Sequence, residues 1–341
     1  MRILRTCSSA NEPGRRARLL AVILALLLPA AALFSLCVGA SGASLLTGVA
    51  DLLSGVSSPA ARFVRYIRLP RVLAAMLAGA ALAASGVLIQ GVLGNPLAGP
   101  NVIGVNAGAG FFTLLCACLL PSAATLLPAA AFAGALLTSL IILLLADRMG
   151  ASRITVVLAG VAISSIFSAG SDLITTLSPD TTLGMSAFMI GGFADVNASR
   201  LRIAAVYMLP ALAISLLLAG DLDVLALGDE VAASLGLRVR RTRVLLLAVA
   251  SVLAGAAVSF AGLLGFVGLI VPHAVRRAVG GEHRQLLPLS LLGGARVTLL
   301  CDTAARTVFA PYEVPVSILL SLVGGPFFLF LLLKGRKGVR A

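Results

Sequence analysis

Runs of about 20 apolar residues recur along the whole sequence, and they constrain the fold more than any other feature, because a helix of that length spans the hydrocarbon core of a bilayer. Of 341 residues, 60% are hydrophobic and only 11% are charged. That composition leaves too little polar surface to cover a soluble domain of this size. Backbone polar groups inside a bilayer must be satisfied within the protein, so the runs predict an all-α, polytopic membrane protein.

The apolar runs predict about ten transmembrane helices between residues 19 and 333. The first run ends with Leu36 before Cys37 and is too long for a secretion signal, so we expect a retained span. The eighth span is short, and eight crossings remain an alternative. The predicted spans are 19–40, 72–93, 102–120, 123–146, 154–174, 201–218, a pair within 244–279 that turns back near Leu264, 286–305 and 317–333.

The basic residues predict which way the chain faces. Residues 1–18 are basic and contain Pro13 and Gly14, which indicates a disordered cytoplasmic tail, and residues 334–341 form a basic C-terminal tail. Lys and Arg concentrate in segments that this topology places in the cytoplasm, as the positive-inside rule requires. Basic loops that face an anionic cytoplasmic leaflet explain most of the net charge of +13. We therefore expect no nucleic acid partner. Residues 41–71 are expected to be an external loop with one short surface helix.

Residues 228–241 form a charged island between two apolar runs. Asp229 and Glu230 suit the positive end of a short helix, Val231 and Leu235 fall on one helical face, and Gly236 can adopt the left-handed conformation that ends a helix. The sequence therefore predicts a stub helix of about two turns. On composition alone, a partner-binding surface and a solvated loop that only sets topology are equally good interpretations.

Several chemistries find no support in the sequence. It contains no phosphate-binding loop of the Gly-x-x-x-x-Gly-Lys type, so any nucleotide hydrolysis must come from another chain. Its five cysteines form no Cys-x-x-Cys motif and lie near no histidine, and we expect neither a metal site nor a structural disulfide. The polar residues within the predicted spans are mainly neutral, namely Asn, Gln and Ser, which suits a bulky substrate better than a small ion. An ion-coupled secondary carrier and a membrane-embedded enzyme are the alternatives from other classes.

Eight ordered motifs resemble the FecCD-type permease family of bacterial ABC importers, which take up iron-siderophores, haem and cobalamin. In the first half they are Ile67-Arg68-Leu69-Pro70-Arg71, Gly86-Val87-Leu88-Ile89-Gln90, Asn95-Pro96-Leu97-Ala98 and Gly104-Val105-Asn106-Ala107-Gly108-Ala109. In the second half they are 158–162, 226–236, 265–273 and Glu313-Val314-Pro315-Val316. The resemblance covers nearly everything after the N-terminal tail.

The resemblance implies a ten-helix permease subunit in the bacterial inner membrane, with both termini cytoplasmic. Such a subunit pairs with a second permease, either a copy or a paralogue, and sits on two ATP-binding subunits. An external substrate-binding protein delivers the cargo. The chain itself would be no enzyme and bind no cofactor, since ATP and Mg belong to the ATPase subunits. A ferric siderophore is the favoured cargo, and haem or cobalamin is the alternative.

The resemblance also assigns roles to three groups of residues. The island, within coupling helices at about 221–243, would transmit nucleotide-driven movement through Asp229, Glu230, Ala232, Ser234, Leu235 and Gly236. Binding-protein docking would fall to Arg68, Arg71 and Arg306, although membrane anchoring, or for Arg306 an ion pair with Asp302, explains them as well. Constrictions of the translocation path would fall to Asn95, Leu97, Ala151 and Ser152, although Asn95-Pro96 could simply end a helix. Arg296, in the ninth predicted span, receives no role.

Overall fold

The computed structural model describes residues 12–38, 45–56, 58–148 and 153–335, and within these ranges it contains helices and no strand. The α-helices are α1 (Glu12–Cys37), α2 (Leu45–Leu53), α3 (Pro59–Phe63), α4 (Leu69–Leu93), α5 (Val105–Leu119), α6 (Leu127–Arg148), α7 (Arg153–Leu177), α8 (Pro179–Ile190), α9 (Ala198–Leu217), α10 (Ala219–Ala226), α11 (Asp229–Ser234), α12 (Val239–Ala261), α13 (Val267–Val279), α14 (His283–Ala305) and α15 (Val316–Gly335). Shorter turns are the π-helical η1 (Val64–Arg68) and the 3-10 helices η2 (Pro100–Ile103) and η3 (Ala124–Leu126).

The predicted spans all correspond to helices of the structure. Seven stretches of the described chain are long and apolar enough to cross a membrane, and α5, α15 and α13 account for the three remaining predicted spans. The predicted turn between the seventh and eighth spans is confirmed, because α12 ends at Ala261 and Gly262 follows with φ +71°. The eighth span, α13, is 13 residues long. The all-α membrane fold is therefore confirmed.

The chain before the second span differs from the predicted loop. Pro59 to Leu93 forms one helical rod of 35 residues that joins α3, η1 and α4. Pro70 cannot donate a backbone hydrogen bond, but it lies in the first turn of α4, and the π-helical η1 lets Leu69 donate to the carbonyl of Val64 five residues back. The rod therefore runs through the end of the segment that was predicted to be an external loop.

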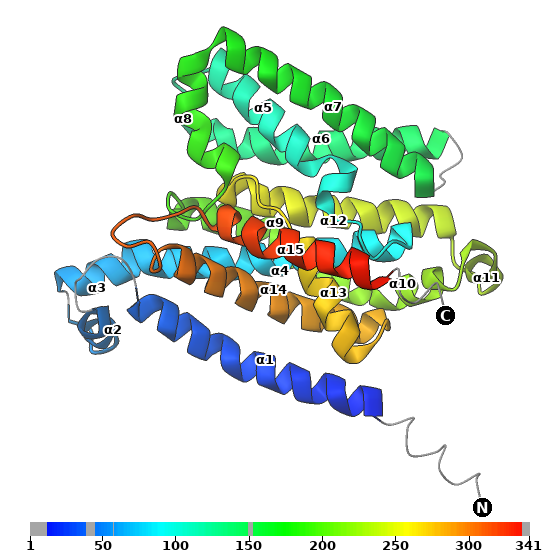
Figure 1. Cartoon of the computed structure of the whole chain (residues 1–341), viewed down its shortest axis with the longest axis horizontal. Coiled ribbons are helices and arrows are strands. Elements are labelled where there is room, and N and C mark those ends of the chain that lie inside the picture. Colours follow the sequence, from blue (N-terminus) through cyan, green and yellow to red (C-terminus); the bar gives the residue numbers. More distant parts are fainter. Residues whose placement is uncertain (1–11, 39–44, 57, 149–152, 336–341) are drawn as a thin grey trace, which may run out of the picture.

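Helix α4 is the centre of the bundle, with α12 on one side and α14 on the other (Figure 1). Most of its side chains are buried. Close contact depends on glycine: a Cβ at Gly79 would lie 2.2 Å from the carbonyl oxygen of Gly294, and one at Gly86 would lie 1.8 Å from that of Gly268. Small residues allow such backbone approach between membrane helices. Gly79, Ala83 and Gly86 thus lie at the close contacts of α4 with α13 and α14.

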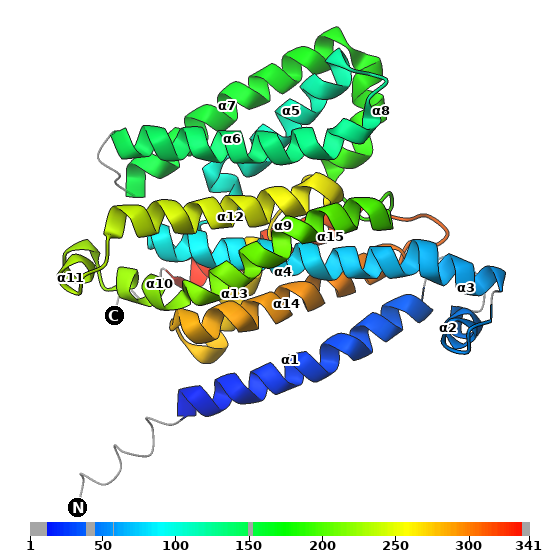
Figure 2. The same ribbon diagram turned by 180° about the vertical axis from the view of Figure 1, so that it is seen from behind.

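The two ends of the bundle differ. At one end, here called the α3 end, α1 and α14 finish and the rod of α3 and α4 begins, with α2 beside it (Figures 1 and 2). At the opposite end, here called the α11 end, α11 projects beyond the longer helices. Helices α5 to α8 form a lobe on one side of the layer of α4, α12 and α14, and α1 lies on the other side (Figures 1 and 2).

Replacing Gly86 with alanine should destabilise the bundle by about 1–3 kcal/mol, because the new methyl group meets the backbone of α13 and the helices must separate. The measurement is the thermal midpoint of the detergent-solubilised chain, followed by size-exclusion chromatography of heated samples. Gly325→Ala in α15 is the matched control, since a Cβ there meets no atom within 4 Å. Equal midpoints for the two variants would show that the close approach does not matter.

Candidate functional site

Helix α11 is a short, sharply bounded helix. Gly228 precedes it with φ +103° and Gly236 follows it with φ +87°. The amide of Gly236 donates to the carbonyl of Ala233, and the amide of Leu237 donates to that of Ala232, both at 3.0 Å. This pattern closes the helix C-terminus around a left-handed residue. The predicted stub helix and the left-handed Gly236 are confirmed.

Ionic contacts fasten α11 and the preceding α10 to the long helices. Arg243 of α12 pairs with the carboxylate of Asp229 at 2.9 and 3.0 Å. Asp223 of α10 accepts hydrogen bonds from the backbone amides of His283 (2.6 Å) and Arg284 (3.3 Å), and it lies 2.8 Å from Nδ1 of His283. Its carboxylate therefore caps the N-terminus of α14, where negative charge is favourable. Movement of α11 must then be shared with α12 and α14.

The exposed surface of α11 carries large apolar side chains beside polar ones. Val231 is 47% exposed and Leu235 is 62% exposed, whereas Ala232 is buried beneath them. Glu230 and Ser234 are exposed on the same short helix, and Leu227 just before it is also exposed. The α11 end therefore carries a rigid projection with an uncovered apolar tip.

A buried cluster of charges lies at the α3 end and is here called the arginine cluster: Arg68, Arg71, Asp302, Arg306 and Glu313. Arg71 holds Asp302 through Nε and Nη2 at 3.0–3.1 Å, and its Nη1 lies 2.6 Å from Glu313. Nε of Arg306 lies 3.2 Å from Oδ2 of Asp302, an oxygen that Nε of Arg71 also contacts. Asp302 is thus a buried carboxylate shared by two guanidinium groups.

The remaining donors of the cluster bind the end of α1. Arg306 donates to the carbonyl and hydroxyl of Ser35, and both Arg306 and Arg68 donate to the carbonyl of Val38 at 2.9 Å. Because a buried charge is costly unless it is paired and hydrogen-bonded, these contacts lock α1, α4 and α14 together.

The three predicted docking arginines are therefore interior residues in this structure. Arg306 is fully buried, and Arg68 and Arg71 are nearly so. The alternative explanation for Arg306, an ion pair with Asp302, is present. Direct docking would need an exposed guanidinium, which this conformation does not provide, and a docking role stays a prediction. Glu313 belongs to the cluster, but its side chain is 38% exposed. No role was predicted for it from the sequence.

The residues predicted to form a constriction are only partly described. Asn95 accepts a hydrogen bond from the amide of Leu97 at 2.9 Å and follows Gly94, whose φ is +57°. This geometry ends α4, as the alternative interpretation expected. Leu97 also lines a cavity of about 190 Å³ between the 97–102 segment, residues 264–269 and Phe328. Ala151 and Ser152 lie outside the described residues.

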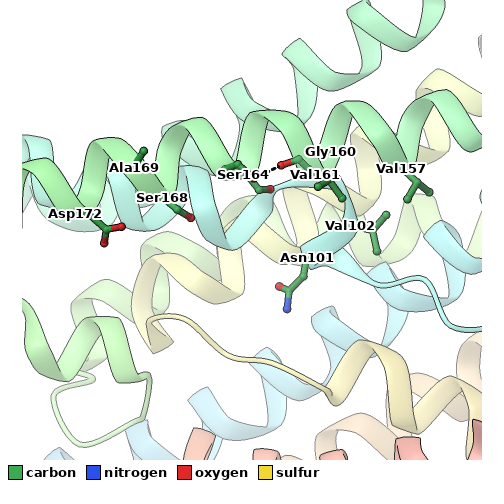
Figure 3. A pocket seen from close by; sticks show the side chains of 10 residues that line it. Asn101, Val102, Val157, Gly160, Val161, Ser164, Ser168, Ala169 and Asp172 are labelled. Carbon is green, nitrogen blue, oxygen red and sulfur yellow. Dashed lines mark hydrogen bonds between the residues drawn. The ribbon is translucent and has the colours of Figure 1, made fainter.

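A larger groove of about 500 Å³ follows one face of α7 (Figure 3). Its polar lining consists of three serine hydroxyls, one amide and one carboxylate, namely Ser164, Ser165, Ser168, Asn101 and Asp172. Residues 101–102 approach α7 closely, since a Cβ at Gly160 would lie 1.9 Å from the carbonyl oxygen of Val102. This groove was not predicted from the sequence. The sequence signal that could have revealed the groove was a set of serines three and four residues apart along an apolar span.

Two unexplained polar residues remain in the spans. Both ring nitrogens of His273 are buried without a hydrogen-bond partner among the described residues. The ring lies edge-on to that of Phe327, with the two ring centroids 6.3 Å apart. His273 is therefore surrounded by packing contacts. Nε of Arg296 also lacks a hydrogen-bond partner within the described ranges, and nothing in the structure explains why an arginine stands there.

Known proteins resemble this chain in sequence and in fold. The hemin transport system permease protein of Yersinia pestis is 42% identical over 277 residues, which cover 80% of this chain and 83% of that protein. An Fe(3+)-citrate import system permease protein of Bacillus subtilis is 35% identical over 319 residues, which cover 93% of this chain and 96% of that protein. A solved structure described as an inward-facing, metal-chelate type ABC transporter superposes with a TM-score of 0.80 at 32% identity, covering 93% of this chain and 99% of that one.

The family match extends over nearly the whole chain, from residue 26 to residue 334. It includes the central α4, the groove along α7, the arginine cluster and α11. These agreements in sequence, fold and extent establish that the chain belongs to the FecCD transport family.

Proposed function

We propose that the chain is the transmembrane permease subunit of an ATP-driven importer that moves a ferric chelate, with an iron-siderophore as the favoured cargo. Family membership and relatives named for hemin and Fe(3+)-citrate support a metal-chelate cargo. The proposed location is the bacterial inner membrane, and the cargo arrives from a substrate-binding protein. The proposed assembly contains a second permease, and two further subunits that bind ATP and Mg.

The observation that carries the proposal is the geometry of α11. An apolar tip formed by Val231 and Leu235 projects from the bundle, and ionic contacts through Asp229 and Asp223 fasten its base to α12 and α14. A partner that binds the tip can therefore move long helices rather than a flexible loop. In the proposed function this partner is an ATP-binding subunit, and the coupling residues are Asp229, Glu230, Ala232, Ser234, Leu235 and Gly236.

The proposed orientation places the α11 end in the cytoplasm, together with both termini. Arg238, Arg240 and Arg241 begin α12 at this end, and Arg276 and Arg277 end α13 there. Such concentrations of basic residues favour the cytoplasmic side. The α3 end then faces the substrate-binding protein.

The groove along α7 is the proposed wall of the translocation path. Its volume of about 500 Å³ and its lining of hydroxyl and amide groups with a single carboxylate, Asp172, suit a bulky chelate that slides past mostly neutral groups. Leu97, with Asn95 beside it, is the proposed constriction near the α11 end. Ala151 and Ser152 are retained as a second proposed constriction because they precede α7 directly.

Uptake in proteoliposomes tests the proposed function. With the candidate ATPase and binding protein present, we expect ATP-dependent uptake of a ferric siderophore in preference to haem or cobalamin. Hydrolysis of ATP should rise when the cargo-loaded binding protein is added. Uptake that ignores ATP but follows an imposed ion gradient would contradict the proposal and favour a secondary carrier.

Gly236→Pro should abolish uptake and the stimulation of ATP hydrolysis while membrane insertion is retained. Proline fixes φ near −65°, far from the +87° of Gly236, and it removes the amide that donates to Ala233. Gly236→Asn is the matched control, because asparagine tolerates the left-handed region and should preserve coupling. Normal uptake by the proline variant would refute the coupling role of α11.

Glu313→Gln should increase the association rate of the binding protein, most clearly at low salt. Glu313 partly neutralises Arg71 at the surface of the arginine cluster, so its removal makes this surface more positive and, in the proposed docking, attracts acidic groups of the binding protein more strongly. Stability should change by only about 0–1 kcal/mol, because Glu313 is partly solvated. Association kinetics at two ionic strengths provide the measurement, with Glu282→Gln as the matched control, because Glu282 is exposed and precedes α14 at the opposite end of that helix. An unchanged rate would count against docking through the arginine cluster.

A further inference from the structure

The short helix α2 carries an apolar face that no other part of the described chain covers. Leu46, Val49, Ala50 and Leu53 follow the spacing of one helical face, and Leu46 and Leu53 are 71% and 83% exposed. Another side of α2 packs on α3, where a Cβ at Gly48 would lie 2.9 Å from the carbonyl oxygen of Ala60. Helix α2 is thus held in place with apolar side chains pointing outward.

The orientation of α2 suits a membrane surface. Its axis runs across the direction of the long helices, and it lies just beyond the point where α1 finishes (Figures 1 and 2). Helix α1 itself exposes large apolar side chains along its length, including Leu26, Leu33 and Phe34. The outward face of α2 therefore continues the apolar surface of a membrane-spanning helix at its end.

A second observation comes from the adjacent rod. Leu73, Leu69, Tyr66 and Arg62 follow one another toward the α3 end at spacings of three and four residues. Leu73 and Tyr66 are exposed large side chains, Arg62 is exposed, and Arg65 lies 5.8 Å from the ring of Tyr66. The order aliphatic, aromatic and then cationic is the order of side chains met on leaving the hydrocarbon core for the headgroups.

The length of the rod agrees with this order. Helix α4 alone has 25 residues, or about 37 Å, which is enough to cross a hydrocarbon core of about 30 Å. The ten residues of α3 and η1 extend the rod further toward the α3 end. They must therefore lie at the level of the lipid headgroups, and α2, which packs on them, lies there too.

The position of α2 favours lipid over a protein partner. The groove along α7 lies in the lobe of α5 to α8, on the far side of the layer formed by α4, α12 and α14 (Figures 1 and 2). A partner centred on the groove would sit away from α2. The surface that α2 continues is instead that of α1, which faces away from the lobe.

We propose that α2 and the Arg62–Tyr66 stretch form a membrane-interface site that rests on phospholipids of the leaflet at the α3 end. Leu46, Val49 and Leu53 enter the outer part of the acyl chains, and Arg62 and Arg65 contact lipid phosphates. In the proposed orientation this is the outer leaflet. The site fixes the end of the α4 rod, and thereby the arginine cluster, at a set height in the bilayer. It does not depend on the cargo or on coupling to an ATPase.

The chain contains no tryptophan, so a single introduced tryptophan reports its own surroundings. We would place it at Leu53 in the full chain, in phospholipid nanodiscs, with Leu46→Trp as a second position on the same face. Leu26→Trp on the exposed face of α1 is the reference within the bilayer, and Tyr312→Trp in the α14–α15 connection is the reference in water. The quenchers are acrylamide in solution and phospholipids brominated either near the glycerol or near the methyl end of the acyl chain.

The tryptophan fluorescence of the Leu53→Trp variant should be quenched most by lipids brominated near the glycerol, and several-fold less by acrylamide than that of Tyr312→Trp. Leu46→Trp should behave in the same way, whereas Leu26→Trp should respond most to the deeper bromines. Acrylamide quenching equal to that of Tyr312→Trp at both α2 positions would place α2 in water and overturn the proposal. Protection from lipid and acrylamide alike would also overturn it, because protein would then cover this face.

Discussion

The contact of α4 with α13 and α14 through bare backbone is the constraint on which the rest of the structure depends. Glycines at 79 and 86 face Gly294 and Gly268, so that carbonyl oxygens occupy the places where side chains would stand. Inside a bilayer, apolar side chains gain little by leaving lipid, and close packing must supply the attraction between helices. The hydroxyl of Ser85 adds a bond to the carbonyl of Ala250 in α12 at 2.8 Å. The lobe and α1 then assemble around this inner layer.

Charge is distributed differently at the two ends of that layer. At the α3 end, Asp302 pairs with Arg71 and Arg306 in the interior, and the end of α1 accepts further hydrogen bonds from Arg306 and Arg68. The cluster stabilises the junction of three helices because every buried charge there has a partner. At the α11 end, the ion pairs lie nearer the surface and fasten a short helix with an exposed apolar tip. One end is therefore built to hold helices together, and the other to present a surface.

Local sequence signals predicted local structure well. The spans, the turn near Leu264 and the stub helix closed by Gly236 follow from apolar length and glycine positions. Helix α8 was not predicted, because its threonines and Gly184 are poor helix formers. Tertiary bonds hold its end instead: the carbonyl of Phe188 accepts from Leu263, and the amide of Gly192 donates to Ala261. The groove along α7 was also missed, because hydroxyl groups on an apolar helix do not reveal which face is open.

By itself, the sequence determined an all-α membrane protein, its span order and its family motifs, because apolar length and turn chemistry are local properties. Only the tertiary structure decided which apolar faces pack on protein and which remain uncovered, since a membrane helix is apolar on its protein-facing side and on its lipid-facing side alike. The tertiary structure also decided where the arginines lie and which groups they bind. Arg71 binds Asp302, which is 231 residues away in the sequence, and Arg306 binds Ser35, which is 271 residues away. Long-range packing brings these charges together in the interior, whereas the local pattern indicated docking or membrane anchoring and, for Arg306, an ion pair with Asp302.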